Sequence, residues 1–250
     1  MSNRLERLRR YLAEQQVAAA IIARPENRQY FSGFTGTSGV LLVDATQAVL
    51  VTDFRYVEQA KAQAPAFTVV RHERKLLDTV VELVKAWGAE TLGFEGDFIT
   101  WNDYKTLAEQ LGEGRLKSID LASIRMVKDE DEIALLKKAA SIADAAFAHI
   151  LSYLKPGVLE RDIAMELEFI MRKLGSQRNA FDIIVASGAR SALPHGVASD
   201  KPLAVGDVVT LDFGAVYQGY HSDITRTVFL GKASQKQRDL YGLVLEAQLA

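Results

Sequence analysis

Residues 207–231 read DVVTLDFGAVYQGYHSDITRTVFLG, with two apolar, β-branched runs on either side of a turn-rich centre at Gln218-Gly219. Runs of this kind at 208–211 and 224–229 are typical of the two arms of a β-hairpin. Each arm carries one aspartate, Asp212 in the first and Asp223 in the second. Aspartate is depleted in strands and is rarely buried without a partner, so two of them in one hairpin need an explanation.

Hairpin geometry places the two carboxylates on the same face. Side chains alternate along a strand, and directly opposed residues share a face. A two-residue loop at Gln218-Gly219 sets Asp223 opposite Gly214, which shares its face with Asp212. Any loop with an even number of residues keeps the pair together, whereas an odd number separates it. The spacing permits a divalent metal site, but by itself it favours a solvated or arginine-paired couple of aspartates.

The composition is that of a globular protein with one large or two ordinary domains. The 250 residues are 48% hydrophobic and 25% charged. A net charge of −2 gives no support for nucleic acid or an anionic membrane as a main partner. The chain has no cysteine, which excludes disulfides and thiolate sites.

The first 16 residues form an amphipathic pattern with Leu5, Leu8 and Leu12 on one face, and they lack the apolar core of a signal peptide. The longest apolar run, 17–23, is too short to span a bilayer. We therefore expect a soluble, cytoplasmic protein.

Residues 1 to about 122 alternate helix-like and strand-like segments, which predicts an α/β domain. Strands are expected at 18–23, 40–43, 48–52, 67–70, 91–94 and 116–119, and helices at 1–16, 56–64, 75–87 and 102–111. Pro25 is expected to close the first strand. The glycine-rich loop 33–39 lacks the lysine of a phosphate-binding loop and is interpreted as a turn, and Asp53 as a helix cap.

The acidic run at 129–132 marks a change of pattern and suits the first turn of a long helix ending near Leu154. A second helix is expected at 160–174, a strand at 181–186, and a final helix after a capping box at Ser234 and Gln237. The change of pattern divides the chain into domains at 1–125 and 126–250.

Few other side chains could join the two aspartates in chemistry. His195 lies in a small-residue loop between a proline and a glycine, and His221 lies two residues before Asp223. Thr225 could orient a carboxylate, although threonine is also an ordinary strand residue. The triplet at 212–214 spells the DFG of protein kinases, but no HRD precedes it, which excludes a kinase.

Several phrases together resemble one family. LPHGVASDK (193–201), GDVVTLDFGAVYQGYHSDITRT (206–227) and IRMVKDEDEI (124–133) are similar to the Xaa-Pro peptidases, aminopeptidase P and prolidase. These are metallopeptidases of the pita-bread fold, related to creatinase and methionine aminopeptidase. GFTGTSG (33–39) and TDFRYVEQA (52–60) resemble the creatinase-type N-terminal domain. The resemblance covers essentially the whole chain. It implies an α/β N-terminal domain with a mixed sheet, followed by the first half of an α+β pita-bread catalytic domain.

The resemblance also implies a site and a reaction. Asp212 corresponds to a ligand of one metal, Asp223 to a ligand bridging two metals, and Thr225 to the threonine beside it. His195 corresponds to the substrate-pocket histidine that stabilises the tetrahedral intermediate. The implied cofactors are two divalent ions, Mn²⁺ first and Co²⁺ or Zn²⁺ as alternatives, which activate a bridging water. The implied substrate is a peptide with proline at the second position, and the implied assembly is a homo-oligomer, commonly a dimer.

The family's other ligands, one histidine and two glutamates, follow the hairpin and are absent from these 250 residues. We therefore expect either a truncated and by itself inactive portion of an Xaa-Pro peptidase, in whose longer form Asp223→Asn abolishes turnover, or a degenerate gene product. The alternative is a non-catalytic pita-bread protein that binds peptides or protein partners.

Overall fold

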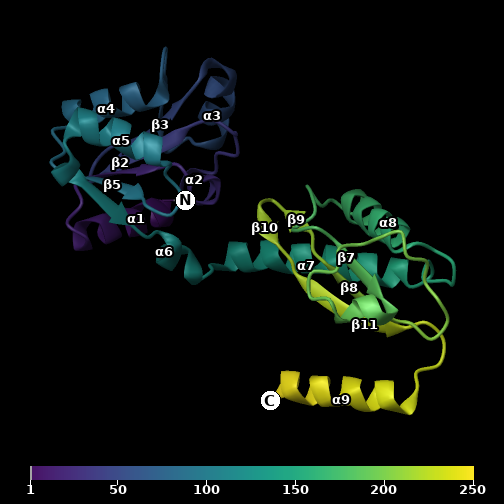
Figure 1. The fold of residues 1–250 in the computed structure, drawn as a ribbon. Helices are drawn as coiled ribbons and strands as arrows, with labels where there is room; N and C mark the ends of the chain where they lie inside the picture. Colours follow the sequence, from purple (N-terminus) through teal and green to yellow (C-terminus); the bar gives the residue numbers. More distant parts are fainter. Residues whose placement is uncertain (1) are drawn as a thin grey trace. The chain divides into compact units, whose positions relative to one another are not determined.

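The computed structural model describes residues 2–250, which form two units, one ending at Val127 and one beginning at Lys128. Figure 1 shows the elements of each unit. The first unit contains helices α1 (Ser2–Glu14), α2 (Pro25–Ser32), α3 (Val57–Gln63), α4 (Leu76–Ala86), α5 (Trp101–Leu111) and α6 (Ala122–Met126), with short 3-10 turns at Phe54–Tyr56 and Glu113–Arg115. Its strands are β1 (Ala19–Ile22), β2 (Val40–Asp44), β3 (Ala48–Thr52), β4 (Thr68–Arg71), β5 (Leu92–Glu95) and β6 (Leu116–Ile119).

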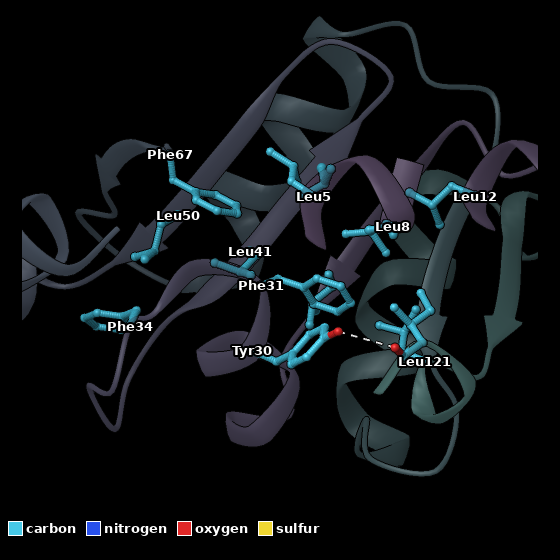
Figure 2. Close-up of a cluster of buried hydrophobic side chains, with 14 of the residues drawn as sticks. Leu5, Leu8, Leu12, Tyr30, Phe31, Phe34, Leu41, Leu50, Phe67 and Leu121 are labelled. Atoms are coloured by element: carbon cyan, nitrogen blue, oxygen red, sulfur yellow. Dashed lines mark hydrogen bonds between the residues drawn. The ribbon is translucent and has the colours of Figure 1, made fainter. Parts of the chain in front are cut away.

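The first unit is a mixed sheet between two layers of helices. Its strand order is β4-β3-β2-β1-β5-β6, with β1 antiparallel to β2 and parallel to β5. Alternate residues of β1 and β2 enter two different cores, so both strands are buried on both faces. One core gathers side chains from α1, α2 and α3, including Leu8 and Phe31 (Figure 2), and the other gathers those of α4 and α5. This mixed sheet confirms the expected fold class.

Helix α2 corrects one expectation about this unit. Pro25 does not merely close the first strand; it occupies the first turn of α2, where its fixed φ suits a helix and its missing N–H costs nothing. Asp53 caps the following turn as expected, because its side chain accepts a hydrogen bond from the Arg55 backbone N–H.

The second unit contains α7 (Glu130–Ile150), α8 (Glu160–Lys173) and α9 (Gln235–Leu249), with a 3-10 turn at Gly188–Ala192. Its strands are β7 (Ile184–Ser187), β8 (Val208–Phe213), β9 (Val216–Tyr217), β10 (Tyr220–His221) and β11 (Ile224–Phe229). The antiparallel sheet β11-β8-β7 packs one face against α7 and α8. That core includes Val209, Leu211 and Phe213 from β8.

Capping boxes mark the starts of α7 and α9. Asp129 and Glu132 form the capping box of α7, and Ser234 and Gln237 form that of α9. Within residues 2–250, no helix combines the length and apolar character needed to cross a membrane.

Candidate functional site

The hairpin has the register that its turn predicts. Gln218 and Gly219 both have positive φ, 48° and 83°, which is the conformation of a two-residue type I′ turn. Tyr217 pairs with Tyr220 across it, and further along Asp212 pairs with Thr225. The even-length loop and its register are therefore confirmed.

The face of β8 opposite the helices carries Asp212. Burial alternates along the strand, with Val209, Leu211 and Phe213 buried and Asp212 partly exposed. Asp223 lies immediately before β11 and is exposed, rather than inside a continuous strand as the pattern suggested. The ladder is interrupted there because the Ala215 N–H donates to the Ser222 hydroxyl at 2.9 Å, while the Ser222 N–H still donates to the Ala215 carbonyl at 2.9 Å.

Burial and the charge of Asp223 both act on the carboxylate of Asp212. Burial raises the pKa of Asp212; a hydrogen bond from the Thr225 side chain lowers it, and the negative charge of Asp223 raises it again. Asp212 Oδ1 is buried and has no hydrogen-bond partner. A buried, unpaired carboxylate oxygen beside a second carboxylate suits a hard divalent cation, so these residues fit as two oxygen ligands.

Asp212 and Asp223 would supply only two ligands to a metal ion. No group of three or more His, Cys, Asp or Glu among residues 2–250 is arranged to hold a metal ion. A two-metal hydrolytic site normally uses four or more protein ligands, so the pair alone would account for only part of such a site.

His195 belongs to the loop between β7 and β8 and is exposed. Two residues later, Val197 bridges Ile184, which in turn pairs with Asp212. Thr225, Asp212, Ile184 and Val197 thus form one row across the sheet. Neighbouring strands are about 4.8 Å apart, which puts Val197 roughly 10 Å from Asp212 along that row. The loop that carries His195 therefore comes back to the sheet at Val197, in the same row as Asp212.

His221 has a different environment. It pairs with Val216 in the short ladder of β9 and β10, and its Nε2 lies 3.4 Å from a guanidinium nitrogen of Arg178. A neighbouring cation opposes metal binding at this ring, so the arrangement does not add His221 to the ligand pair.

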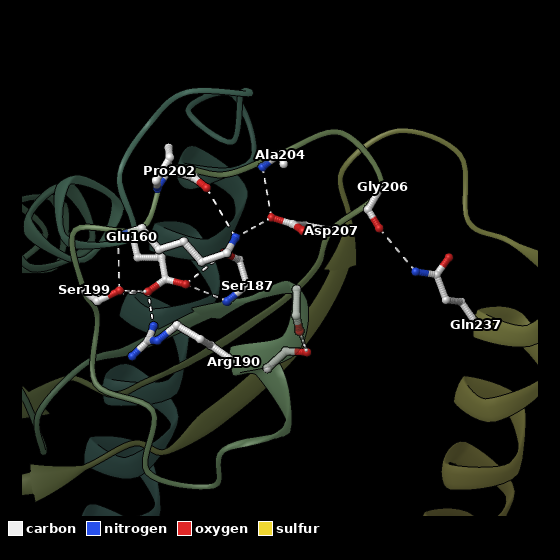
Figure 3. A network of polar contacts seen from close by, with 12 residues as sticks. Glu160, Ser187, Arg190, Ser199, Pro202, Ala204, Gly206, Asp207 and Gln237 are labelled. Carbon is white, nitrogen blue, oxygen red and sulfur yellow. Dashed lines mark hydrogen bonds and ion pairs between the residues drawn. The ribbon is translucent and has the colours of Figure 1, made fainter.

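The sequence interpretation missed a polar network next to the His195 loop. Glu160 starts α8, as expected, but its carboxylate is fully buried among Ser187, Arg190 and Ser199 (Figure 3). Nearby, Lys201 Nζ donates to Asp207 at 2.8 Å and to the Ser187 hydroxyl at 2.7 Å. These partners are distant from Glu160 in sequence, and nothing in the residues next to Glu160 predicts them.

Family models match both units of the chain. Residues 4–127 match the creatinase/prolidase N-terminal domain, and residues 134–250 match metallopeptidase family M24. The uncharacterized peptidase YqhT of Bacillus subtilis is 43% identical, over 98% of this chain and 70% of its own length. The Xaa-Pro dipeptidase of Pyrococcus furiosus is 39% identical, over 99% of this chain and 70% of its own.

Solved structures give the same result. An Xaa-Pro dipeptidase from Bacillus anthracis is similar with a TM-score of 0.95 and 47% identity, covering 99% of this chain and 70% of that one. The prolidase from Pyrococcus furiosus is similar with a TM-score of 0.86 and 38% identity, covering 96% and 70%. The chain belongs to metallopeptidase family M24, and its first unit is the creatinase/prolidase N-terminal domain of that family.

Proposed function

We propose that this chain contributes to a metal-dependent peptidase that cleaves the bond between an N-terminal residue and proline. Membership of a metallopeptidase family implies divalent metal ions. The observation that carries the proposal is the pair Asp212 and Asp223, one of which has a buried and unpartnered oxygen. The relatives named as Xaa-Pro dipeptidases supply the substrate class.

Each residue has a defined part in this proposal. Asp212 and Asp223 hold the ions, and Thr225 orients the Asp212 carboxylate. Bound divalent ions supply a Lewis acid and lower the pKa of water, which provides a nucleophile at neutral pH. His195 donates a hydrogen bond to the oxygen that becomes negative as the peptide carbonyl turns tetrahedral.

We also propose Mn²⁺ as the ion, with Co²⁺ and Zn²⁺ as alternatives, and a homodimer in the cytoplasm as the working form. Oxygen ligands from carboxylates suit Mn²⁺ better than softer ions. Titration with each metal in turn tests the identity of the ion, and size-exclusion chromatography with light scattering tests the homodimer.

The direct test of the site is Mn²⁺ titration followed by NMR. The paramagnetic ion is expected to broaden the amide signals of residues 211–213 and 223–225 first, because they surround the two carboxylates. Asp212→Asn and Asp223→Asn should abolish this broadening, whereas Asp239→Asn, an exposed aspartate of α9, should preserve it.

Broadening centred elsewhere, or unchanged by both substitutions, would contradict the site. Absence of any metal binding would also contradict the site, and peptide binding without metal would favour the non-catalytic alternative, which does not require the pair. Metal-dependent cleavage of an Ala-Pro dipeptide by these 250 residues would overturn the expectation that they are inactive alone.

A further inference from the structure

The carboxylate of Glu160 holds two separate parts of one loop. Its Oε1 accepts hydrogen bonds from the backbone N–H and hydroxyl of Ser187, both at 2.8 Å. Its Oε2 accepts from the backbone N–H and hydroxyl of Ser199, at 3.2 Å and 2.6 Å, and from Arg190 Nη1. The side chain is 0% exposed, so these donors replace all of its water (Figure 3).

The two serines mark the beginning and the end of the segment that carries His195. We call residues 187–199 the histidine loop. Arg190, inside the loop, also donates from Nη2 to the Val197 carbonyl at 2.9 Å. Between these contacts the loop is largely exposed, with Leu193 53% accessible, so it makes little apolar contact that could fix its position.

The negative charge of the Glu160 carboxylate suits the donors that surround it. A carboxylate accepts on both oxygens, and here it meets five N–H or O–H donors, one of them a guanidinium. An amide in its place has one accepting oxygen, and its NH₂ group would face donors. Helix α8 packs into the core through Ile163 and Leu167, so the carboxylate is fixed on a rigid element.

We propose that Glu160 is a positioning residue that holds the histidine loop closed and thereby sets His195 beside the aspartate face. Because Val197 bridges Ile184, and Ile184 pairs with Asp212, closing the loop at Ser199 fixes where His195 lies relative to Asp212. The role of His195 rests on the proposed function, whereas the closure of the loop does not.

The test compares Glu160→Gln with Glu132→Gln by hydrogen exchange and NMR relaxation. Glu132 is the matched control because it is also a buried glutamate in the first turn of a helix of the same unit. In Glu160→Gln we expect amide exchange at 188–199 to rise about tenfold or more, and the order parameter of the His195 amide to fall below about 0.6. Both should stay at wild-type values in Glu132→Gln, and β8 should exchange as in wild type in both variants.

Unchanged exchange in the histidine loop of a folded Glu160→Gln protein would overturn the proposal, as would an equal rise throughout the unit. If Glu160→Gln does not fold, Ser199→Ala provides the test, because it removes the hydroxyl donor at one end of the loop and leaves the carboxylate and the backbone N–H donor in place. Faster exchange confined to the loop supports the closure even if no metal binds at Asp212, so the two proposals can fail separately.

A catalytic measurement tests whether Glu160 acts through His195. In a form that hydrolyses Xaa-Pro peptides, Glu160→Gln is expected to lower kcat about tenfold with KM changed less than about twofold. Glu160→Gln should lower kcat little further when His195 is already replaced by Asn, because the two substitutions then remove the same interaction. Full additivity of the two effects would exclude action through His195.

Discussion

Buried charge in this protein is used to hold loops through their backbone. In the first unit, Arg28 is 3% exposed and donates to the carbonyl oxygens of Gly36 and Gly39, each at 2.5 Å. Burial lowers the pKa of Arg28, and the negative charge of Glu95 opposes that shift. The guanidinium of Arg28 on α2 therefore holds the glycine-rich loop 33–39. The sequence predicted this loop to be a turn but did not predict the contact with Arg28.

Replacing Arg28 by Met should destabilise the first unit by about 3 kcal/mol, because two buried carbonyl groups lose their donor. Urea unfolding followed by the fluorescence of Trp87 and Trp101 measures this change. The matched control is Arg10→Met, an exposed arginine of α1, which should cost less than about 0.5 kcal/mol. Equal effects of the two substitutions would contradict the role given to Arg28.

Acid should weaken the second unit through Glu160. Burial raises the pKa of Glu160, but hydrogen bonds from Ser199 and Ser187 outweigh it, so the folded-state pKa lies below the ordinary value of 4.5. A lowered carboxylate pKa stabilises the folded state above the unfolded value and loses that effect as pH falls through the folded value. The stability gap between wild type and Glu160→Gln should therefore be full above about pH 4.5 and shrink below it.

Urea midpoints measured from pH 7 down to pH 3 check this dependence. A gap that widens as the pH falls would contradict the lowered pKa.

At the scale of elements, the break in the hairpin ladder depends on one glycine. A methyl group at Gly214 would overlap the backbone carbonyl oxygen of Ser222 and touch Ala180. Gly214→Ala should cost about 3 kcal/mol, since backbone must move to accept it, and should weaken Mn²⁺ binding at Asp212 and Asp223. Thermal unfolding and metal titration measure the two effects.

Gly242→Ala in α9 is the matched control, because a methyl group there meets nothing within 4 Å. It should stabilise the helix by up to about 1 kcal/mol without changing metal binding. A tolerated Gly214→Ala would show that the close approach to Ser222 is not required.

The sequence predicted elements wherever local chemistry decides them. The turn at Gln218-Gly219, the capping box at Ser234 and Gln237 and the amphipathic helices follow from residues close in the chain, and all are found. Helix α2 was missed because Pro25 signals both the end of a strand and the start of a helix. The contacts of Glu160 and Arg28 were missed because they join residues that only the tertiary fold brings together. The metal chemistry itself came from resemblance, since the aspartate spacing alone favoured a solvated pair.

At the scale of the whole molecule, each unit has a hydrophobic core of its own. Leu8 is fully buried in a core of the first unit, and Leu211 is fully buried in that of the second. Leu8→Ala and Leu211→Ala should each destabilise their own unit by about 2–5 kcal/mol. Hydrogen exchange resolved by peptide should show Leu8→Ala raising exchange in residues 2–127 and Leu211→Ala in 128–250. A change spread evenly over both ranges by either substitution would contradict separate cores.

The turn at Gln218-Gly219 also bears on the order of events during folding. A hairpin of this kind closes over a short stretch of chain, in roughly 1–10 μs for isolated examples. Glu160 must instead find partners 27 to 39 positions away, which carries a larger loop-closure cost. The two carboxylates are thus brought to one face by a local event that needs no ion as a template. Metal bound at the proposed site should stabilise the unit by mass action on a preformed pair, and should slow unfolding more than it speeds refolding.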